Sequence, residues 1–168
     1  FTKHFNTTHF ADTSKISIQM AARELRYNFF DELCNSQQFD TILTAHHADD
    51  NLETFFINLS RGSGIDGLTG IPKINDKIAR PLLPFSRNQI YEYAKTHNIQ
   101  WCEDSSNASL KYKRNALRHE LIPVLKSIFP TILEALNTTQ NNLIASQDLL
   151  KNHTEDIENR VIKFSSLD

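Results

Sequence analysis

The 168-residue sequence is poor in the residues from which disulfide scaffolds, zinc sites and membrane spans are built. Its two cysteines, Cys34 and Cys102, lie far apart and form no CxxC pair, so we expect two free thiols in a reducing compartment. No apolar stretch approaches the roughly 20 residues that a transmembrane helix needs. These scarcities predict a cytoplasmic protein with no membrane partner.

An excess of charge of one sign is also missing. The 18 Lys and Arg residues nearly balance the 20 Asp and Glu residues, which gives a formal net charge of −2. Overall charge therefore offers no attraction to nucleic acid, and any such affinity must come from a local basic patch. The hydrophobic content of 39% is that of a globular protein with an ordinary core.

Glycine is scarce, and all four glycines fall between Gly62 and Gly70. The segment Gly62-Ser-Gly-Ile-Asp-Gly67 matches GxGxxG, but it follows a helical pattern instead of a strand, so we reject a dinucleotide-binding fingerprint. Two interpretations stay open. The segment is either a helix C-cap followed by a mobile loop, or a loop whose bare backbone approaches a nucleotide or a nucleic acid closely.

Polar side chains crowd the point where a short apolar run, Ile42–Leu43, gives way to a helical pattern. They are His46, His47, Asp49 and Asp50, with Glu53 one turn later. In an open α/β sheet, ligands bind just past the carboxyl ends of the parallel strands, where loops lead into helices. The sequence therefore predicts that the chemistry of this protein lies at this strand-to-helix turn.

We expect the helix that follows to run from Asp49 or Asp50 to Arg61. Asp50 and Glu53 lie about 60° apart on it and an apolar stripe occupies the opposite side, so the two carboxylates should point away from the core. The stripe consists of Leu52, Phe55, Phe56 and Leu59. The alternative is a capping box with Asp50 as N-cap and Glu53 as its partner. Capping alone does not explain the two histidines in the same turn.

The rest of the chain alternates helical and extended patterns, which predicts an α/β fold built on a parallel sheet. Extended segments are expected at 7–10, at 39–45 and at 78–85, the last as an edge strand or connector because it contains prolines. Helices are expected at 17–33, at 86–97 behind a Ser86–Gln89 capping box, around 117–125 with a new turn at Pro123, and from 131 to beyond 160.

One dense basic patch interrupts the balanced charge. It consists of Lys111, Lys113, Arg114 and Arg118. Arg114 and Arg118 are four residues apart and share a helix face. The patch is either a solvated face or a face that contacts phosphates, for which the planar fork of arginine is well suited.

Six motifs follow one another along the chain. They are Ala21-Ala-Arg-Glu-Leu-Arg-Tyr27, Thr44-Ala-His-His-Ala-Asp-Asp-Asn-Leu-Glu-Thr54, Arg61-Gly-Ser-Gly-Ile-Asp-Gly-Leu68, Arg80-Pro-Leu-Leu-Pro-Phe-Ser-Arg87, Glu103-Asp-Ser-Ser-Asn107 and Arg114-Asn-Ala-Leu-Arg-His-Glu-Leu-Ile-Pro123. In this order they resemble the tRNA(Ile)-lysidine synthetases, a family of the PP-loop ATP pyrophosphatase superfamily. The resemblance covers about Ser17 to Pro123. The related tRNA thiolation enzymes rely on cysteines that this chain does not supply.

The resemblance implies a partial PP-loop fold (adenine nucleotide alpha hydrolase-like), with a parallel sheet and flanking helices over residues 1–125 and a long connecting helix over 126–168. It also implies a ligation that uses ATP and Mg²⁺. C2 of the wobble cytidine of tRNA(Ile) with a CAU anticodon is activated as an adenylated intermediate, with release of pyrophosphate. The amine of free lysine then attacks and forms lysidine. The resemblance leaves room for a homodimer.

By motif position, the resemblance places His46 and Asp50 at the ATP and reaction centre, with Asp50 available to hold Mg²⁺. Arg118 would stabilise negative charge on the phosphates or the adenylate, so Asp50 and Arg118 are the expected catalytic residues. Further ATP-binding residues would be Asp49, Glu53, Arg61, Ser63 and Gly64. Lys111, Lys113, Arg114 and Asn115 would support the site or meet the tRNA. We therefore expect the carboxylates and the guanidinium groups to face one pocket.

The sequence departs from this family in two respects. The phosphate-cradling motif Ser-Gly-Gly-x-Asp-Ser is absent, and so are the C-terminal domains that the family commonly uses on tRNA. We therefore expect a fragment that is inactive by itself. Two other functions stay open: a non-catalytic tRNA-binding module that uses the basic patch, and a metal-dependent hydrolase that uses the residues from His46 to Glu53. For the hydrolase, the HExxH helical spacing is missing.

Overall fold

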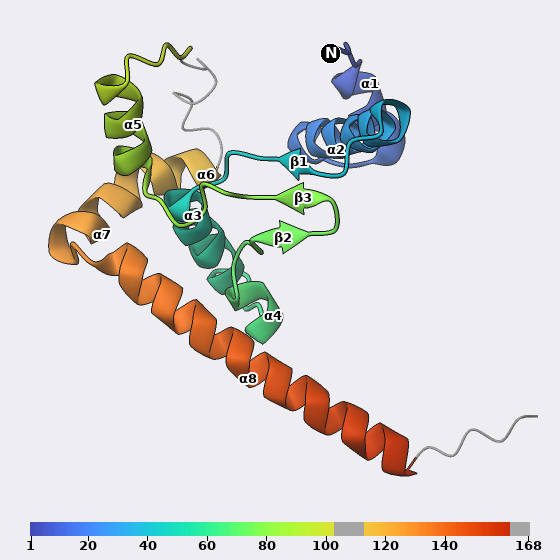
Figure 1. Cartoon of the computed structure of the whole chain (residues 1–168), viewed down its shortest axis with the longest axis vertical. Coiled ribbons are helices and arrows are strands. Elements are labelled where there is room, and N and C mark those ends of the chain that lie inside the picture. Colours follow the sequence, from blue (N-terminus) through green and yellow to red (C-terminus); the bar gives the residue numbers. More distant parts are fainter. Residues whose placement is uncertain (103–112, 162–168) are drawn as a thin grey trace, which may run out of the picture. The chain divides into compact units, whose positions relative to one another are not determined.

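The computed structural model describes residues 1–102 and 113–161 (Figure 1). These residues form two compact units. The first comprises Phe1–Thr44 and Ile74–Ala79, and the second comprises Ala45–Lys73 and the described residues from Arg80 onward. Helices dominate both units, and the described strands all lie in the first. The α/β class predicted from the sequence is confirmed.

The first unit begins with two helices that pack against each other. The side chain of Asn6 caps α1 (Thr7–Ser14), and the side chain of Ser17 caps α2 (Ile18–Gln37). The strand predicted over the first residues of α1 is wrong. There the Asn6 side chain accepts a hydrogen bond from a backbone amide of the first turn at 3.1 Å, which favours a helix over an extended chain.

The sheet of the first unit is small and mixed. β1 (Ile42–Leu43) pairs in parallel with β3 (Ile78–Ala79), and β3 pairs antiparallel with β2 (Ile74–Asn75). The order β1-β3-β2 makes β3 the central strand, whereas the sequence placed 78–85 at an edge or in a connector. The prolines of that segment follow β3 and so do not interrupt the ladder. The strand expected over 39–45 is reduced to two paired residues.

The second unit is built from helices. They are α3 (Ala48–Leu59), α4 (Ile65–Leu68), α5 (Arg87–Thr96), α6 (Lys113–Ala116), the π-helical segment η2 (Leu117–Leu121), α7 (Ile122–Ile128) and α8 (Ile132–Val161). The predicted Ser86–Gln89 capping box is confirmed at the start of α5, and Pro123 lies in the first turn of α7 as expected. Within the described ranges, no helix is long and apolar enough to cross a membrane.

The core of the second unit joins three of these helices. Leu52 of α3, Ile122 of α7 and Leu136 of α8 are buried together. The side chains packed around them are Phe55, Phe56, Ile132 and Leu133. Burial of one such side chain contributes about 1.5–3 kcal/mol to stability. Leu59, which the sequence placed in the same stripe, is 50% exposed. The core fixes α3 against α7 and α8, and thereby the directions in which its polar side chains point.

Candidate functional site

A capping box of His47 and Asp50 closes the turn that leads into α3. Asp50 N donates to His47 Nδ1 at 3.2 Å, and His47 N donates to Asp50 Oδ2 at 3.0 Å. His47 is therefore the N-cap and Asp50 the third helical residue, so the predicted capping box of Asp50 and Glu53 is wrong. The cap lies one turn earlier because the imidazole ring of His47 supplies the acceptor.

Glu53 is fully buried, at 0% exposure, but it lies outside the apolar core cluster of Leu52, Ile122 and Leu136, so its burial does not contradict the predicted direction of the carboxylates. Arg114 Nε donates to Glu53 Oε2 and Arg118 Nε donates to Glu53 Oε1, both at 2.6 Å. Because an unpaired buried charge costs several kcal/mol, this carboxylate depends on the two guanidinium groups. The core covers α3 over Leu52, and α6 and η2 cover it over Glu53, so two adjacent residues are both buried.

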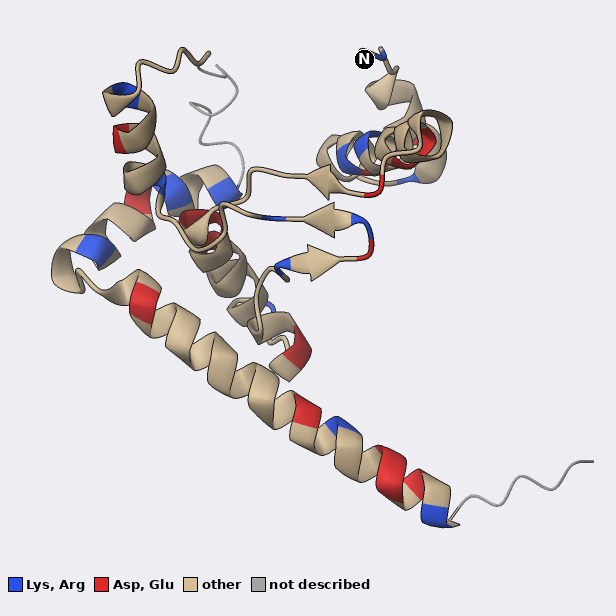
Figure 2. Ribbon diagram, in the orientation of Figure 1, with Lys and Arg blue, Asp and Glu red and all other residues tan. Residues whose placement is uncertain are grey.

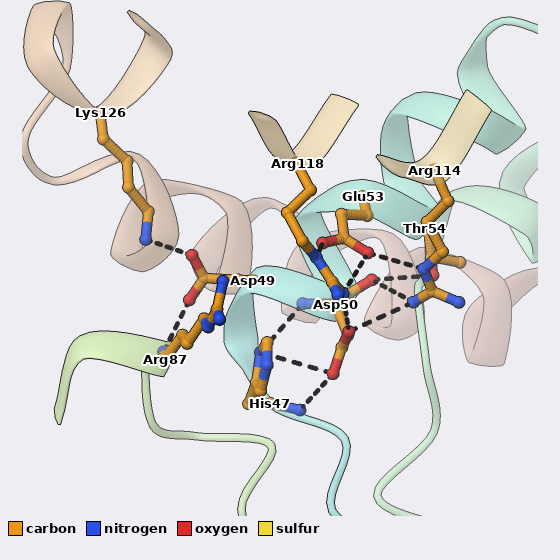
Figure 3. Close-up of polar contacts among 9 residues, drawn as sticks. All are labelled: His47, Asp49, Asp50, Glu53, Thr54, Arg87, Arg114, Arg118 and Lys126. Carbon is orange, nitrogen blue, oxygen red and sulfur yellow. Dashed lines mark hydrogen bonds and ion pairs between the residues drawn. The ribbon is translucent and has the colours of Figure 1, made fainter. Parts of the chain in front are cut away.

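Asp50 extends the network toward the N-terminus of α3 (Figure 3). Its Oδ1 accepts a hydrogen bond from Arg118 Nη2 at 3.0 Å and lies 3.5 Å from Arg114 Nη2. The same Arg114 nitrogen donates to the backbone carbonyl of Asp50 at 3.3 Å. We call Asp50, Glu53, Arg114 and Arg118 the α3 ion cluster.

The pKa of Arg118 is raised above its ordinary value. Burial by itself favours the neutral form, but the hydrogen bond to Glu53 and the negative charges of Glu53, Asp50 and Asp49 outweigh it. Arg118 is therefore a permanent cation. Its side chain is 20% exposed, against 39% for Arg114, so Arg118 is the more enclosed of the two guanidinium groups.

Asp49 points away from the α3 ion cluster, as Figure 3 shows. It forms an ion pair with Lys126 of α7, and its Oδ2 accepts a hydrogen bond from Arg87 N, at the start of α5, at 2.8 Å. Burial alone would raise the pKa of Asp49, but the bonds from Lys126 and Arg87 and the nearby positive charge lower it below 3.8. Asp49 thus ties three helices together. Its predicted role in ATP binding stays a prediction.

The structure brings five of the predicted site residues together at the N-terminal part of α3. They are Asp49, Asp50, Glu53, Arg114 and Arg118. His46 lies in the turn before α3, Asn115 lies in α6 beside Arg114, and Lys113 is exposed. Lys111 and the segment 103–107 lie outside the described residues.

The glycine-rich segment lies beyond the other end of α3. At a rise of 1.5 Å per residue, this end is roughly 13 Å along the helix axis from Asp50. Arg61, Ser63 and Gly64 follow it, and Ser63 N donates to Asn58 O at 3.1 Å. These three residues are therefore attached to the C-terminal turn of α3 and not to the α3 ion cluster. Their predicted role in the ATP site stays a prediction.

The sequence did not indicate the two partners of Asp49, which are the side chain of Lys126 and the backbone amide of Arg87. Lys126 is 77 residues from Asp49, and no periodic pattern connects two positions so far apart. The available signal was weak: Lys126 follows the basic patch on the next helix, and a buried aspartate requires a cationic partner.

The described residues do not form a metal site. No group of three or more His, Cys, Asp or Glu side chains among them could hold an ion. Both carboxylate oxygens of Asp50 already accept hydrogen bonds, from His47 and Arg118, and those of Glu53 face two arginines. These residues therefore do not favour the metal-dependent hydrolase, whereas Mg²⁺ held by one or two carboxylates together with substrate phosphates stays a prediction.

Two arginines of the predicted basic patch are ion-paired in the structure. Arg114 and Arg118 pair with carboxylates, whereas Lys113 is exposed. Because arginine has five N–H donors, these ion pairs fix the two guanidinium groups and still leave donors for another contact. The geometry suits two arginines held in fixed positions better than a solvated patch.

Comparisons with known proteins identify the family of this chain. Residues 3–125 match the PP-loop domain family. A curated tRNA(Ile)-lysidine synthase from Porphyromonas gingivalis is 43% identical over 164 residues, which cover 97% of this chain and 36% of that protein. Those from Bacteroides thetaiotaomicron and Chlorobaculum tepidum are 39% and 43% identical, over 94% and 76% of this chain and 37% and 38% of their own lengths. The chain thus spans little more than a third of the length of these relatives.

Proposed function

Since this chain belongs to the PP-loop domain family, we propose that it acts as a tRNA(Ile)-lysidine synthase. In the proposed reaction, ATP activates C2 of the wobble cytidine of tRNA(Ile) with a CAU anticodon, and free lysine is then joined to that carbon. The name of relatives at 43% identity supports this assignment. The observation that carries it is the buried Glu53, which holds Arg114 and Arg118 within the matched residues.

The two arginines of the α3 ion cluster would supply fixed guanidinium donors to this reaction, while the cluster as a whole carries two positive and two negative charges. Adenylyl transfer builds negative charge on phosphate oxygens, and preorganised cations stabilise it without rearrangement at the moment of reaction. Glu53 bonds to the Nε of both arginines, which restricts the rotation of each guanidinium plane. We assign charge stabilisation to Arg118 and a positioning role to Glu53.

No step of this proposal runs through a metal ion, and Mg²⁺ at Asp50 remains a prediction. ATP is a substrate here, and His46 and Asp50 remain the residues expected nearest to it. Free lysine as the amine, a homodimer, a cytoplasmic location and a connecting role for residues 126–168 remain predictions as well.

The test is lysidine formation by the complete gene product, with ATP, radiolabelled lysine and an unmodified tRNA(Ile) transcript. Arg118→Ala should lower kcat about a hundredfold, because one preorganised charge contact contributes on the order of 3 kcal/mol. Arg160→Ala is the matched control, since Arg160 is exposed on α8. Residues 1–168 alone should form no measurable lysidine. A complete protein that forms none, or an Arg118→Ala variant with unchanged kcat, would refute the proposal.

A further inference from the structure

α8 packs against the other helices of the second unit through one of its faces. Its side chains that are not exposed are Ile132, Leu133, Leu136, Gln140, Leu143 and Gln147. Spacings of three and four residues are those of a heptad stripe, in which apolar residues are the rule. Two glutamines therefore stand where leucine would bury more apolar surface. From Asp148 onward, the described residues of α8 are exposed.

Gln140 is the buried glutamine of this stripe, with 3% exposure. Its Oε1 accepts a hydrogen bond from Asn51 Nδ2 of α3 at 2.6 Å, and its Nε2 donates to the carbonyl of Leu68 in α4 at 3.4 Å. Asn51 Oδ1 accepts in turn from Ile71 N at 2.8 Å. We call Asn51 and Gln140 the amide clamp, because together they hold both sides of the backbone between Leu68 and Ile71.

Gly70 marks how closely this backbone approaches the amide clamp. Its φ is +84°, a conformation that side-chain-bearing residues rarely adopt. A Cβ added there would overlap Gln140 Nε2 and Asn51 Oδ1. The sequence therefore has a glycine where the two amides require bare backbone. The overlap is an observation independent of the hydrogen bonds themselves.

The clamped segment is connected to the start of α3. Pro72, which follows Ile71, accepts a hydrogen bond through its carbonyl from Arg80 Nη1 at 2.7 Å, and Arg80 is 6% exposed. The chain that continues from Arg80 then supports the first turn of α3, where Ala48 N donates to Phe85 O at 2.8 Å. Displacement of the clamped segment would therefore reach the turn that carries His47 and Asp50.

We infer that Gln140 is a positioning residue for the ligation proposed above, on which this role rests. A polar residue within an apolar stripe fixes the register of a helix at some cost in stability. Gln140 fixes the register of α8 against Asn51 and Leu68. It thereby holds the segment from Leu68 to Ile71, which is linked through Pro72 and Arg80 to the chain that supports the first turn of α3. Gln140 touches no reacting group, so its loss should misalign the reaction and leave the binding of substrates intact.

The decisive variant is Gln140→Met in the complete gene product, which keeps the length of the side chain and removes its hydrogen bonds. Hydrogen exchange at the amide of Ile71, which donates to Asn51, should accelerate at least tenfold. kcat for lysidine formation should fall about tenfold, with KM for ATP and lysine changed less than twofold. Assays are run well below the melting temperature of each variant.

Two further variants separate positioning from simple stability. Gln147→Met lies one heptad further along the same stripe, and its partner Asp66 is exposed, so exchange and kcat should both stay within twofold of the parent. Gln140→Ala removes the same two hydrogen bonds and adds no charge at this buried position, so exchange and kcat should change in the same direction as in Gln140→Met. It also serves as the test variant if Gln140→Met does not fold.

The outcomes are distinguishable. If Gln140→Met lowers the melting temperature and leaves kcat unchanged, Gln140 is structural only and the inference is wrong. Unchanged exchange at Ile71 would show that the amide clamp does not hold this segment, and would also overturn it. A parent protein that forms no lysidine would refute the proposed function itself, and the exchange measurement would still report on the amide clamp.

Discussion

The α3 ion cluster and the amide clamp anchor the same helix by different chemistry. In the α3 ion cluster, Glu53 is buried among full charges, and the pKa of Arg118 is raised by them. The amide clamp is neutral, and α8 carries no charged residue between Glu134 and Asp148, the stretch that contains Gln140 (Figure 2). Charges create a field that can act on a substrate, whereas amides fix geometry without one. On α3, the charged groups that can act on a substrate are thus different residues from the neutral groups that fix the position of the helix.

The strongest test of this contrast is Glu53→Gln, which removes the negative charge between Arg114 and Arg118. Stability should fall by about 3–5 kcal/mol, because two cations are left without their buried partner. The measurement is urea unfolding followed by circular dichroism. Glu92→Gln, on the exposed side of α5, is the control and should change stability by less than about 0.5 kcal/mol. Equal effects of the two changes would mean that Glu53 is not an essential counter-ion.

Asp49→Asn should lower stability by an intermediate amount, and this loss should depend on pH. At pH 7 the loss should be about 2 kcal/mol, since the ion pair with Lys126 and the charged acceptor for Arg87 N disappear. The pKa of Asp49 is lowered in the folded state, so the unfolded chain binds the proton first as the pH falls. The stabilisation is therefore complete above about pH 4 and lost below it.

Unfolding curves of the parent and Asp49→Asn between pH 7 and pH 2.5 provide the measurement. The gap in stability between them should narrow as the pH falls below the ordinary carboxyl pKa of 3.8. A gap of constant size would contradict the ionic role of Asp49.

The smallest loss of stability is expected from Asn58→Ala, in the C-terminal turn of α3. Asn58 Nδ2 donates to the carbonyl of Gly67 at 2.7 Å, and a neutral bond of this kind contributes about 1 kcal/mol. No titrating group takes part, so the loss should be the same at pH 7 and pH 2.5. A loss that varies with pH as strongly as that of Asp49→Asn would remove the distinction between the charged and neutral ties of α3.

Local signals predicted the parts of the fold that are held locally. The capping box of Ser86 and Gln89 spans four residues, and the structure forms it as expected. The long helix from 131 is also present, as α8. The Asn6 cap is also a local signal, and it explains why residues 7–10 form a helix instead of the predicted strand. The burial of Glu53 could not be predicted from helix periodicity, because it depends on arginines 61 and 65 residues away.

The candidate site was predictable to the extent that short motifs carry it. The order of motifs pointed to Asp50, Glu53, Arg114 and Arg118 before any geometry was known. Direct pairing among them was not predicted, because the sequence suggested a common pocket instead. The amide clamp had no signal at all, since its two side chains are 89 residues apart and amides follow no charge pattern.

The long-range ties of α3 described above all reach forward along the chain, and those to Arg114, Arg118, Lys126 and Gln140 span 61 to 89 residues. During synthesis at roughly 5–20 residues per second, α3 therefore leaves the ribosome several seconds before its partners exist. Its glutamate must stay hydrated until then, because burial without the arginines is too costly. The helix can form early, but the second unit can close around it only after Lys126 and Gln140 have emerged.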